Sequence, residues 1–275
     1  MISSPSAIAR LRRPRRIWAV ASVHGVVDRF RSVASRMAQR IESGDRIVFL
    51  GNLVGGVPGG EASDVGATID MALRLRRAAI SRWDARACDV VFLRGAQEEM
   101  WGKIDQLHFA TNPREVLRWM LHRGVGATIA AYGGQESIAE GLRAVGDGPM
   151  AIARWTSVLR AAVRARPGHA EFHAAVRRAV QAADAGPLFF NHGIDLDRPL
   201  AAQTDAFWWG AATEVGDLGW PWDGIRRLVR GFDRTRPGLA DGRFTLTLDG
   251  GCGYGGPLLA ALLDADGALI DSLRA

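Results

Sequence analysis

The sequence predicts an α/β fold in which helices flank a sheet. Apolar runs of strand length alternate with amphipathic helical stretches, and the connections between them are short. Polar or glycine-rich loops follow three of these runs, which is typical of strand ends in a parallel or mixed sheet. The chain has 275 residues, of which 48% are hydrophobic, so it can bury one large core. We therefore expect a single domain.

The first half of the chain predicts three strands and two helices. The strands are expected at 17–20, 46–50 and 89–93, each a short apolar run. A helix is expected from Val26 to Ile41, since apolar residues recur at helical spacing until Gly44. A second amphipathic helix is expected over 67–83.

The second half is expected to be more helical before it returns to strands. Helices are predicted over 113–123, 150–166 and 170–185, and the last two are separated by Pro167 and Gly168. We expect a helical insert at about 141–186 within a domain that spans 17–275. A strand is predicted at 188–191, and adjacent antiparallel strands at 243–248, 258–263 and 268–270.

The basic charge gathers most sharply near the N-terminus. The net charge is +6, and Arg10, Arg12, Arg13, Arg15 and Arg16 precede the first expected strand. We predict that residues 1–16 form a basic, flexible leader. An arm that binds nucleic acid or an anionic surface is the alternative, because clustered arginines attract phosphates.

Cysteine usage and hydropathy limit the class of protein. Cys88 and Cys252 form no metal-like spacing, so we expect two buried, inert thiols and no disulfide scaffold. No apolar run is long enough to cross a bilayer, and the N-terminus lacks the apolar segment of a signal peptide. We expect a cytoplasmic protein.

Four segments resemble the metal-binding loops of calcineurin-like metallophosphoesterases. They are Ala21-Ser-Val-His-Gly25, Gly51-Asn-Leu-Val-Gly-Gly-Val-Pro58, Arg94-Gly-Ala-Gln-Glu98 and Phe190-Asn-His-Gly-Ile-Asp195. In order and spacing they are similar to the motifs GDxHG, GDxVDRGP, RGNHE and FVHAGID of the bacterial serine/threonine phosphatase and diadenosine tetraphosphatase branch. The resemblance implies a calcineurin-like metallophosphoesterase sandwich of two mixed β-sheets flanked by helices.

The same resemblance implies that the active site is degenerate. Members of the family hold two divalent ions, such as Mn or Fe, which generate a hydroxide and bind the phosphate oxygens. The corresponding positions here are Ser22, His24, Asn52, Ala96, Asn191 and Phe232. His24 is the only retained ligand, so we expect neither a metal cofactor nor a dinuclear centre.

The catalytic positions are altered in the same way. Gln97 stands where the family has its general acid, and an amide does not titrate in the useful range. Gly56 replaces an arginine that contacts phosphate, whereas Arg94 remains. We expect no catalytic residue; the candidates for contacting a ligand are His24, Asn52, Arg94, Gln97 and Asn191.

Other polar residues are expected to have structural roles. Alternation along a strand would point His192 away from the site unless a bulge intervenes. His169 and His173 are four residues apart, and we expect an exposed pair. Packing in the core or at its rim is favoured over partner binding for Trp208-Trp209 and for Trp220-Pro-Trp222.

These observations leave three hypotheses for function. The first is a pseudophosphatase that binds a protein partner or a phosphorylated ligand. The second is a weak or altered phosphoesterase with a single metal ion at His24, helped by an inward-turned His192 or by a carboxylate from elsewhere in the chain. The third is an anionic-surface or nucleic-acid binder that uses Arg10 to Arg16.

Overall fold

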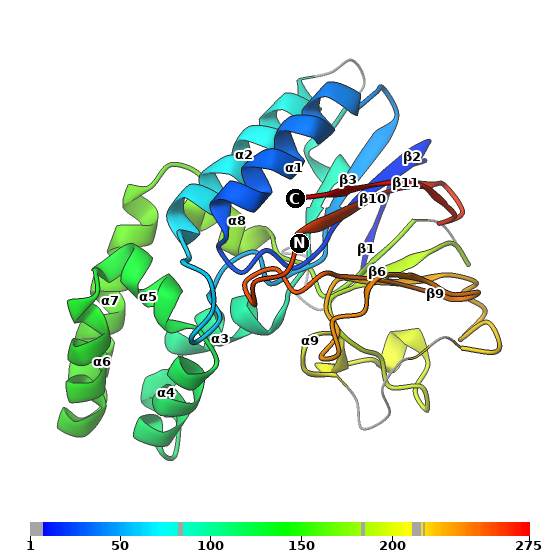
Figure 1. The fold of residues 1–275 in the computed structure, drawn as a ribbon. Coiled ribbons are helices and arrows are strands. Elements are labelled where there is room, and N and C mark those ends of the chain that lie inside the picture. Colours follow the sequence, from blue (N-terminus) through cyan, green and yellow to red (C-terminus); the bar gives the residue numbers. More distant parts are fainter. Residues whose placement is uncertain (1–7, 82–84, 183–184, 211–215, 217) are drawn as a thin grey trace.

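The computed structural model describes residues 8–81, 85–182, 185–210, 216 and 218–275. Its strands form two mixed sheets, with helices packed outside them (Figure 1). The predicted α/β sandwich of two mixed sheets is therefore confirmed.

The first sheet has the strand order β11-β10-β2-β3-β4. Its strands β2 (Arg16–Val20), β3 (Asp45–Phe49) and β4 (Val90–Phe92) run parallel, as short strands joined by helical crossovers do. The strands β10 (Leu259–Asp264) and β11 (Leu269–Arg274) extend the sheet in antiparallel fashion. Loops after β2, β3 and β4 therefore meet at one edge.

Two crossover helices lie together beside this sheet (Figure 1). Helix α1 (Val27–Arg40) buries Phe30, Val33 and Met37, which recur at helical spacing. Helix α2 (Val65–Ile80) begins at Asp64, whose carboxylate accepts a hydrogen bond from the Ala67 amide at 2.9 Å. The expected end of this helix at Trp83 lies outside the described residues.

The second sheet has the order β1-β5-β6-β7-β9-β8. Its strands are β1 (Ala9–Arg10), β5 (Val180–Gln181), β6 (Leu188–Phe190), β7 (Leu228–Arg230), β8 (Gly238–Asp241) and β9 (Thr245–Asp249). The prediction that 243–248 pairs beside 258–263 is wrong, because β9 pairs with β7 and β8. The glycine-rich segment between β9 and β10 carries the chain from one sheet to the other.

The helix expected over 170–185 ends early. Helix α8 (His169–Ala175) stops because the next residues pair with the sheets. The Arg177 amide donates to the Phe92 carbonyl, the Arg94 amide donates to the Arg177 carbonyl, and β5 then pairs with β6. Long-range pairing thus overrides the local helical preference of this alanine-rich stretch.

Six further α-helices lie in the described part of the chain. Helix α3 (Ala96–Ile104) follows β4 directly, and α9 (Ala206–Trp209) lies beside the second sheet. Helices α4 (Pro113–His122), α5 (Gly126–Gly133), α6 (Glu136–Asp147) and α7 (Pro149–Ala165) gather on one side of the molecule (Figure 1). This helical part begins well before residue 141, where the insert was expected. None of the helices in these described ranges is long and apolar enough to span a membrane.

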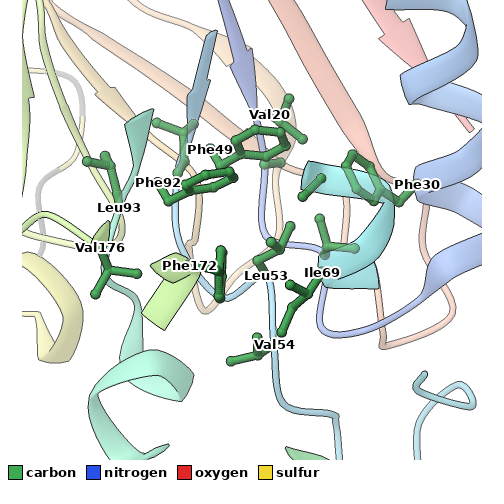
Figure 2. Close-up of a cluster of buried hydrophobic side chains, with 14 of the residues drawn as sticks. Val20, Phe30, Phe49, Leu53, Val54, Ile69, Phe92, Leu93, Phe172 and Val176 are labelled. Atoms are coloured by element: carbon green, nitrogen blue, oxygen red, sulfur yellow. The ribbon is translucent and has the colours of Figure 1, made fainter. Parts of the chain in front are cut away.

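The main core joins the first sheet to its helices and to the second sheet, which contributes Phe189, Val229 and Leu246. Phe49 and Phe92 stack at 4.9 Å between ring centroids, and Phe92 meets Phe172 of α8 edge-on at 5.0 Å (Figure 2). Leu53, from the loop after β3, also contributes to this cluster. Buried aromatic contacts therefore fix the strand ends from which the loops of the candidate site leave.

Part of the expected leader is attached to the fold. Residues 1–7 lie outside the described residues, but Ala9–Arg10 pairs with β5, and Leu11 is buried. Arg12 pairs with Asp89 at 3.0 Å, and Arg16 pairs with Asp45 at 2.8 Å. Ion pairs therefore neutralise much of the charge that an anion-binding arm would use.

The two cysteines differ in exposure, contrary to the expectation that both are buried. Cys88 is exposed because it lies in the short turn Ala87–Asp89 that precedes β4. Cys252 is buried, and its thiol donates to the Val23 carbonyl at 3.3 Å. Burial raises the pKa of Cys252 to about 12, so this thiol is unreactive.

Candidate functional site

Backbone hydrogen bonds bring the first, second and fourth motif segments together, and the Glu98 side chain ties the third segment to the second. The His24 amide donates to the Asn52 carbonyl at 2.8 Å, and the Ser22 amide donates to the Gly231 carbonyl at 3.1 Å. The Phe232 amide donates to the Asn191 carbonyl at 2.9 Å. Loops from both sheets therefore converge on one place, as expected for strand ends in an α/β fold.

The loops retain unusual backbone conformations. His24 and Asn52 have positive φ angles of 52° and 51°, which are uncommon outside glycine and concentrate at functional sites. Gly95 must be glycine, since a Cβ there would lie 2.3 Å from the Asn52 side-chain oxygen. These loops therefore have a backbone geometry that few residue types can adopt.

A network of amide side chains occupies the position of the expected metal ligands. Asn52 Nδ2 lies 3.3 Å from both Ser22 Oγ and Asn191 Oδ1. Asn52 Oδ1 accepts a hydrogen bond from the backbone N–H of Gln97 at 3.1 Å, and Asn191 Nδ2 donates to the Leu50 carbonyl at 2.7 Å. Ser22, Asn52 and Asn191 are each at most 3% exposed. Neutral hydrogen bonds thus satisfy this cluster internally.

Glu98 provides the negative charge closest to this network, but it is already saturated. Its carboxylate accepts hydrogen bonds from the backbone amides of Asn52, Leu53, Val54 and Gly95. Desolvation raises the pKa of Glu98, and these backbone donors oppose that shift. The residue therefore holds two loops together and presents no free oxygen as a ligand.

A cleft of about 360 Å³ opens over the network. Of the sequence candidates, His24, Asn52, Ala96, Gln97 and Phe232 line it. Ser22 and Asn191 lie behind Asn52, and Gly56 lines a neighbouring hollow instead. Arg94 is not in the cleft, because it pairs with Glu99 at 2.8 Å and faces a different hollow.

His192 contradicts the expectation that it points away. Strand β6 ends at Phe190, so strand alternation no longer governs residue 192, and His192 lines the cleft. The Phe232 ring lies close to both imidazoles, with its centroid 5.0 Å from that of His192 and 6.2 Å from that of His24. The two imidazoles therefore share an apolar neighbour where a metal ion would need ligands.

Sequence reasoning missed the cationic and aromatic wall of the cleft. This wall is formed by Arg123, Arg234, Arg236, Trp208, Trp209 and Tyr254. Arg234 and Arg236 follow the segment Arg230-Gly-Phe-Asp233 almost directly, so their place in the sequence could have indicated that they lie near the site. Trp208 and Trp209 were assigned to packing, and Trp208 is indeed buried in the second core cluster at 6% exposure. Both also line the cleft, and the Trp208 indole nitrogen is buried without a partner among the described residues.

The cleft has no acidic residue among the described residues that line it. The acids nearby are engaged elsewhere: Asp233 pairs with Arg230, and Asp249 accepts from the amides of Asp233 and Gly251. Across the described residues, no group of three or more His, Cys, Asp or Glu side chains could hold a metal ion. A larger hollow of about 580 Å³ nearby carries Glu61 and Asp64 as its charged groups and suits anions poorly.

Both histidines of the cleft are neutral at neutral pH. Burial, assisted by the positive charge of Arg236, lowers the pKa of His24 to about 4. Burial also lowers the pKa of His192, against the effect of its backbone hydrogen bond to Phe232. Neither imidazole carries a proton that it could give to a leaving group at pH 7.

The remaining histidine pair also differs from expectation. His169 is fully buried rather than exposed, and its Nδ1 lies 2.8 Å from the Tyr132 hydroxyl. The same hydroxyl lies 3.0 Å from His173 Nε2, and His169 Nε2 lies 3.3 Å from Asp70. This chain of hydrogen bonds joins α8 to α2 and α5, away from the cleft.

Comparison with solved structures identifies the fold. A structure described as a "putative diadenosine tetraphosphatase" aligns over 98% of this chain and 98% of its own, with 16% identity and a TM-score of 0.56. A serine/threonine phosphatase from Saccharomyces cerevisiae covers 98% of this chain and 84% of its own, with 11% identity and a TM-score of 0.48. No protein-family model and no curated protein matches the chain. The first alignment, with the two mixed sheets, shows that the chain has the calcineurin-like metallophosphoesterase fold.

Proposed function

We propose that this protein is a noncatalytic member of the metallophosphoesterase fold that binds a phosphorylated ligand without metal ions. The observation that supports this most directly is the charge of the cleft. Arg123, Arg234 and Arg236 line it, and no carboxylate accompanies them among the described residues of its wall. In this function the guanidinium groups supply the positive charge that metal ions supply in hydrolytic relatives.

The state of these arginines supports the proposal. In the described part of the chain none of the three forms an ion pair with a carboxylate, and all three are exposed. Arg123 and Arg236 instead lie over the rings of Trp119 and Tyr254. Guanidinium groups bind phosphate oxygens through paired, charge-assisted hydrogen bonds, so a phosphoryl group is the expected occupant.

The chemistry of the other cleft residues argues against turnover. Gln97 cannot transfer a proton, and its Nε2 already donates to the Arg123 carbonyl at 2.7 Å. His24 and His192 are neutral at pH 7, as their lowered pKa values require. Hydrolysis would therefore lack a general acid.

Calorimetric titration with phenyl phosphate tests the proposal in buffer that contains EDTA. We expect saturable binding by the wild-type protein and at least tenfold weaker binding by Arg234→Gln/Arg236→Gln. The matched control is Arg74→Gln, which removes an exposed charge from α2, away from the cleft. Loss of affinity only in the cleft variant supports the proposal, and absence of binding in EDTA contradicts it.

A second function is favoured by one observation. His192 lines the same cleft as His24, so the two imidazoles are the best pair for a single metal ion. A weak phosphoesterase would then hydrolyse 4-nitrophenyl phosphate only with Mn²⁺, and His192→Ala would abolish that activity. Phe232 stands against it, since its ring lies close to both imidazoles.

A further inference from the structure

His24 is buried in a way that calls for explanation. Its side chain is 4% exposed, and neither ring nitrogen has a hydrogen-bond partner in the described ranges. The ring instead meets Tyr254 edge-on at 6.0 Å and Phe232 at 6.2 Å. A buried polar group without a hydrogen-bond partner costs stability, and a hydrogen bond from a bound ligand would offset that cost.

Tyr254 is the movable part of this covering. Its side chain is 42% exposed, and its hydroxyl makes no hydrogen bond to the described residues. The backbone around it is fixed, because the Glu61 amide donates to the Gly253 carbonyl and the Gly255 amide donates to the Glu61 carboxylate. The aromatic side chain can therefore rotate away while the loop stays in place.

One cleft residue holds Tyr254 over His24. The guanidinium carbon of Arg236 lies 3.7 Å from the centre of the Tyr254 ring. Arg236 also lines the cleft and forms no ion pair with a described carboxylate. An exposed cation–π contact is weaker than a charge-assisted hydrogen bond to an anion, so a phosphoryl group competes well for this guanidinium.

We propose that Tyr254 is a cover over His24 which is released when an anionic ligand engages Arg236, so that His24 then completes the ligand contacts. The inference rests on the proposed function, because the same phosphorylated ligand occupies the cleft. His24 offers one N–H donor and one acceptor nitrogen, and both become available beside the bound phosphoryl group. The closed cover thus lowers the affinity for the phosphorylated ligand. It also restricts contact with His24 to ligands that bind the Arg236 guanidinium.

Chemical modification of His24 tests the cover in the full-length protein without any ligand. Diethyl pyrocarbonate labelling, followed by peptide mass spectrometry, should modify His24 at least tenfold more slowly than His122, which is exposed. Tyr254→Ala should bring His24 to within about threefold of His122. Tyr254→Phe retains the ring over His24, so His24 should remain slow to react. Equal, slow labelling in wild-type protein and Tyr254→Ala would overturn the cover.

Titration with phenyl phosphate tests the coupling. Because opening no longer costs free energy, Tyr254→Ala should bind about five- to tenfold more tightly than the wild-type protein. Adding His24→Asn should abolish most of this gain, since the uncovered contact is then altered. If phenyl phosphate does not bind at all, the proposed function fails and the coupling fails with it. If it binds but Tyr254→Ala binds no more tightly, only the coupling is overturned.

Discussion

Asn52→Asp introduces the carboxylate that the motif resemblance implies at this position, and we expect it to destabilise this protein. Asn52 Nδ2 faces Ser22 Oγ and Asn191 Oδ1, each at 3.3 Å, and the residue is 2% exposed. A carboxylate oxygen there would face the Asn191 oxygen, which cannot turn away because Asn191 Nδ2 donates to the Leu50 carbonyl. The buried Glu98 carboxylate, which accepts from the Asn52 amide, adds repulsion.

A buried, unpaired charge of this kind costs roughly 2–4 kcal/mol of unfolding free energy. Desolvation and Glu98 would raise the pKa of the new carboxyl, so the penalty is full near pH 8 and shrinks as the group is protonated near pH 5. Urea unfolding followed by tryptophan fluorescence measures it at both pH values. The control is Asn112→Asp at the exposed N-cap of α4, where an aspartate is tolerated. Wild-type stability of Asn52→Asp at pH 8 would refute the account of the amide network.

Three further changes test the fold and its titrating groups. Gly124→Ala should unfold the protein or cost more than about 3 kcal/mol, since the new Cβ would lie 1.9 Å from the Gly56 carbonyl oxygen. The control Gly102→Ala in α3 should stabilise the protein by about 0.5–1 kcal/mol. Thermal denaturation compares the two variants. Tyr132→Phe should cost about 1–3 kcal/mol in chemical denaturation, because the buried His169 and the half-buried His173 lose their shared partner, and no change would contradict that role. Because the pKa of His24 is lowered to about 4, neutral His24 contributes fully to the free energy of unfolding above pH 6.5, and this contribution is lost as the pH falls toward 4. The loss amounts to about 2 kcal/mol at pH 5. His24→Asn should therefore lose less unfolding free energy than the wild-type protein between pH 7 and pH 5.

Local sequence patterns predicted the elements that support the site, because those elements depend on local chemistry. The runs that became β2, β3 and β4 each end in consecutive apolar residues, directly before a loop of the candidate site. The positive φ of Gly51 and Gly55 requires glycine or a residue that tolerates that conformation. Strands and loops of this kind are visible without any tertiary information.

Non-local contacts decided what the sequence did not predict. Helix α8 ends at Ala175 because Arg177 pairs with the chain just after β4, and no local sequence pattern predicts that pairing. His192 turns into the cleft because its strand ends two residues earlier. Arg123 and Arg236 come from loops more than a hundred residues apart, and only the folded chain brings them to one cleft.

The central claim is that arginines and neutral amides, and not two metal ions, occupy the functional cleft. The most direct test is the metal content of the purified protein after equilibration with Mn²⁺ and removal of loosely bound ions. Elemental analysis should find close to no manganese per chain, while phenyl phosphate still binds in EDTA. About two tightly bound ions per chain would contradict the account, because the amide network would then have to reorganise into a two-metal centre.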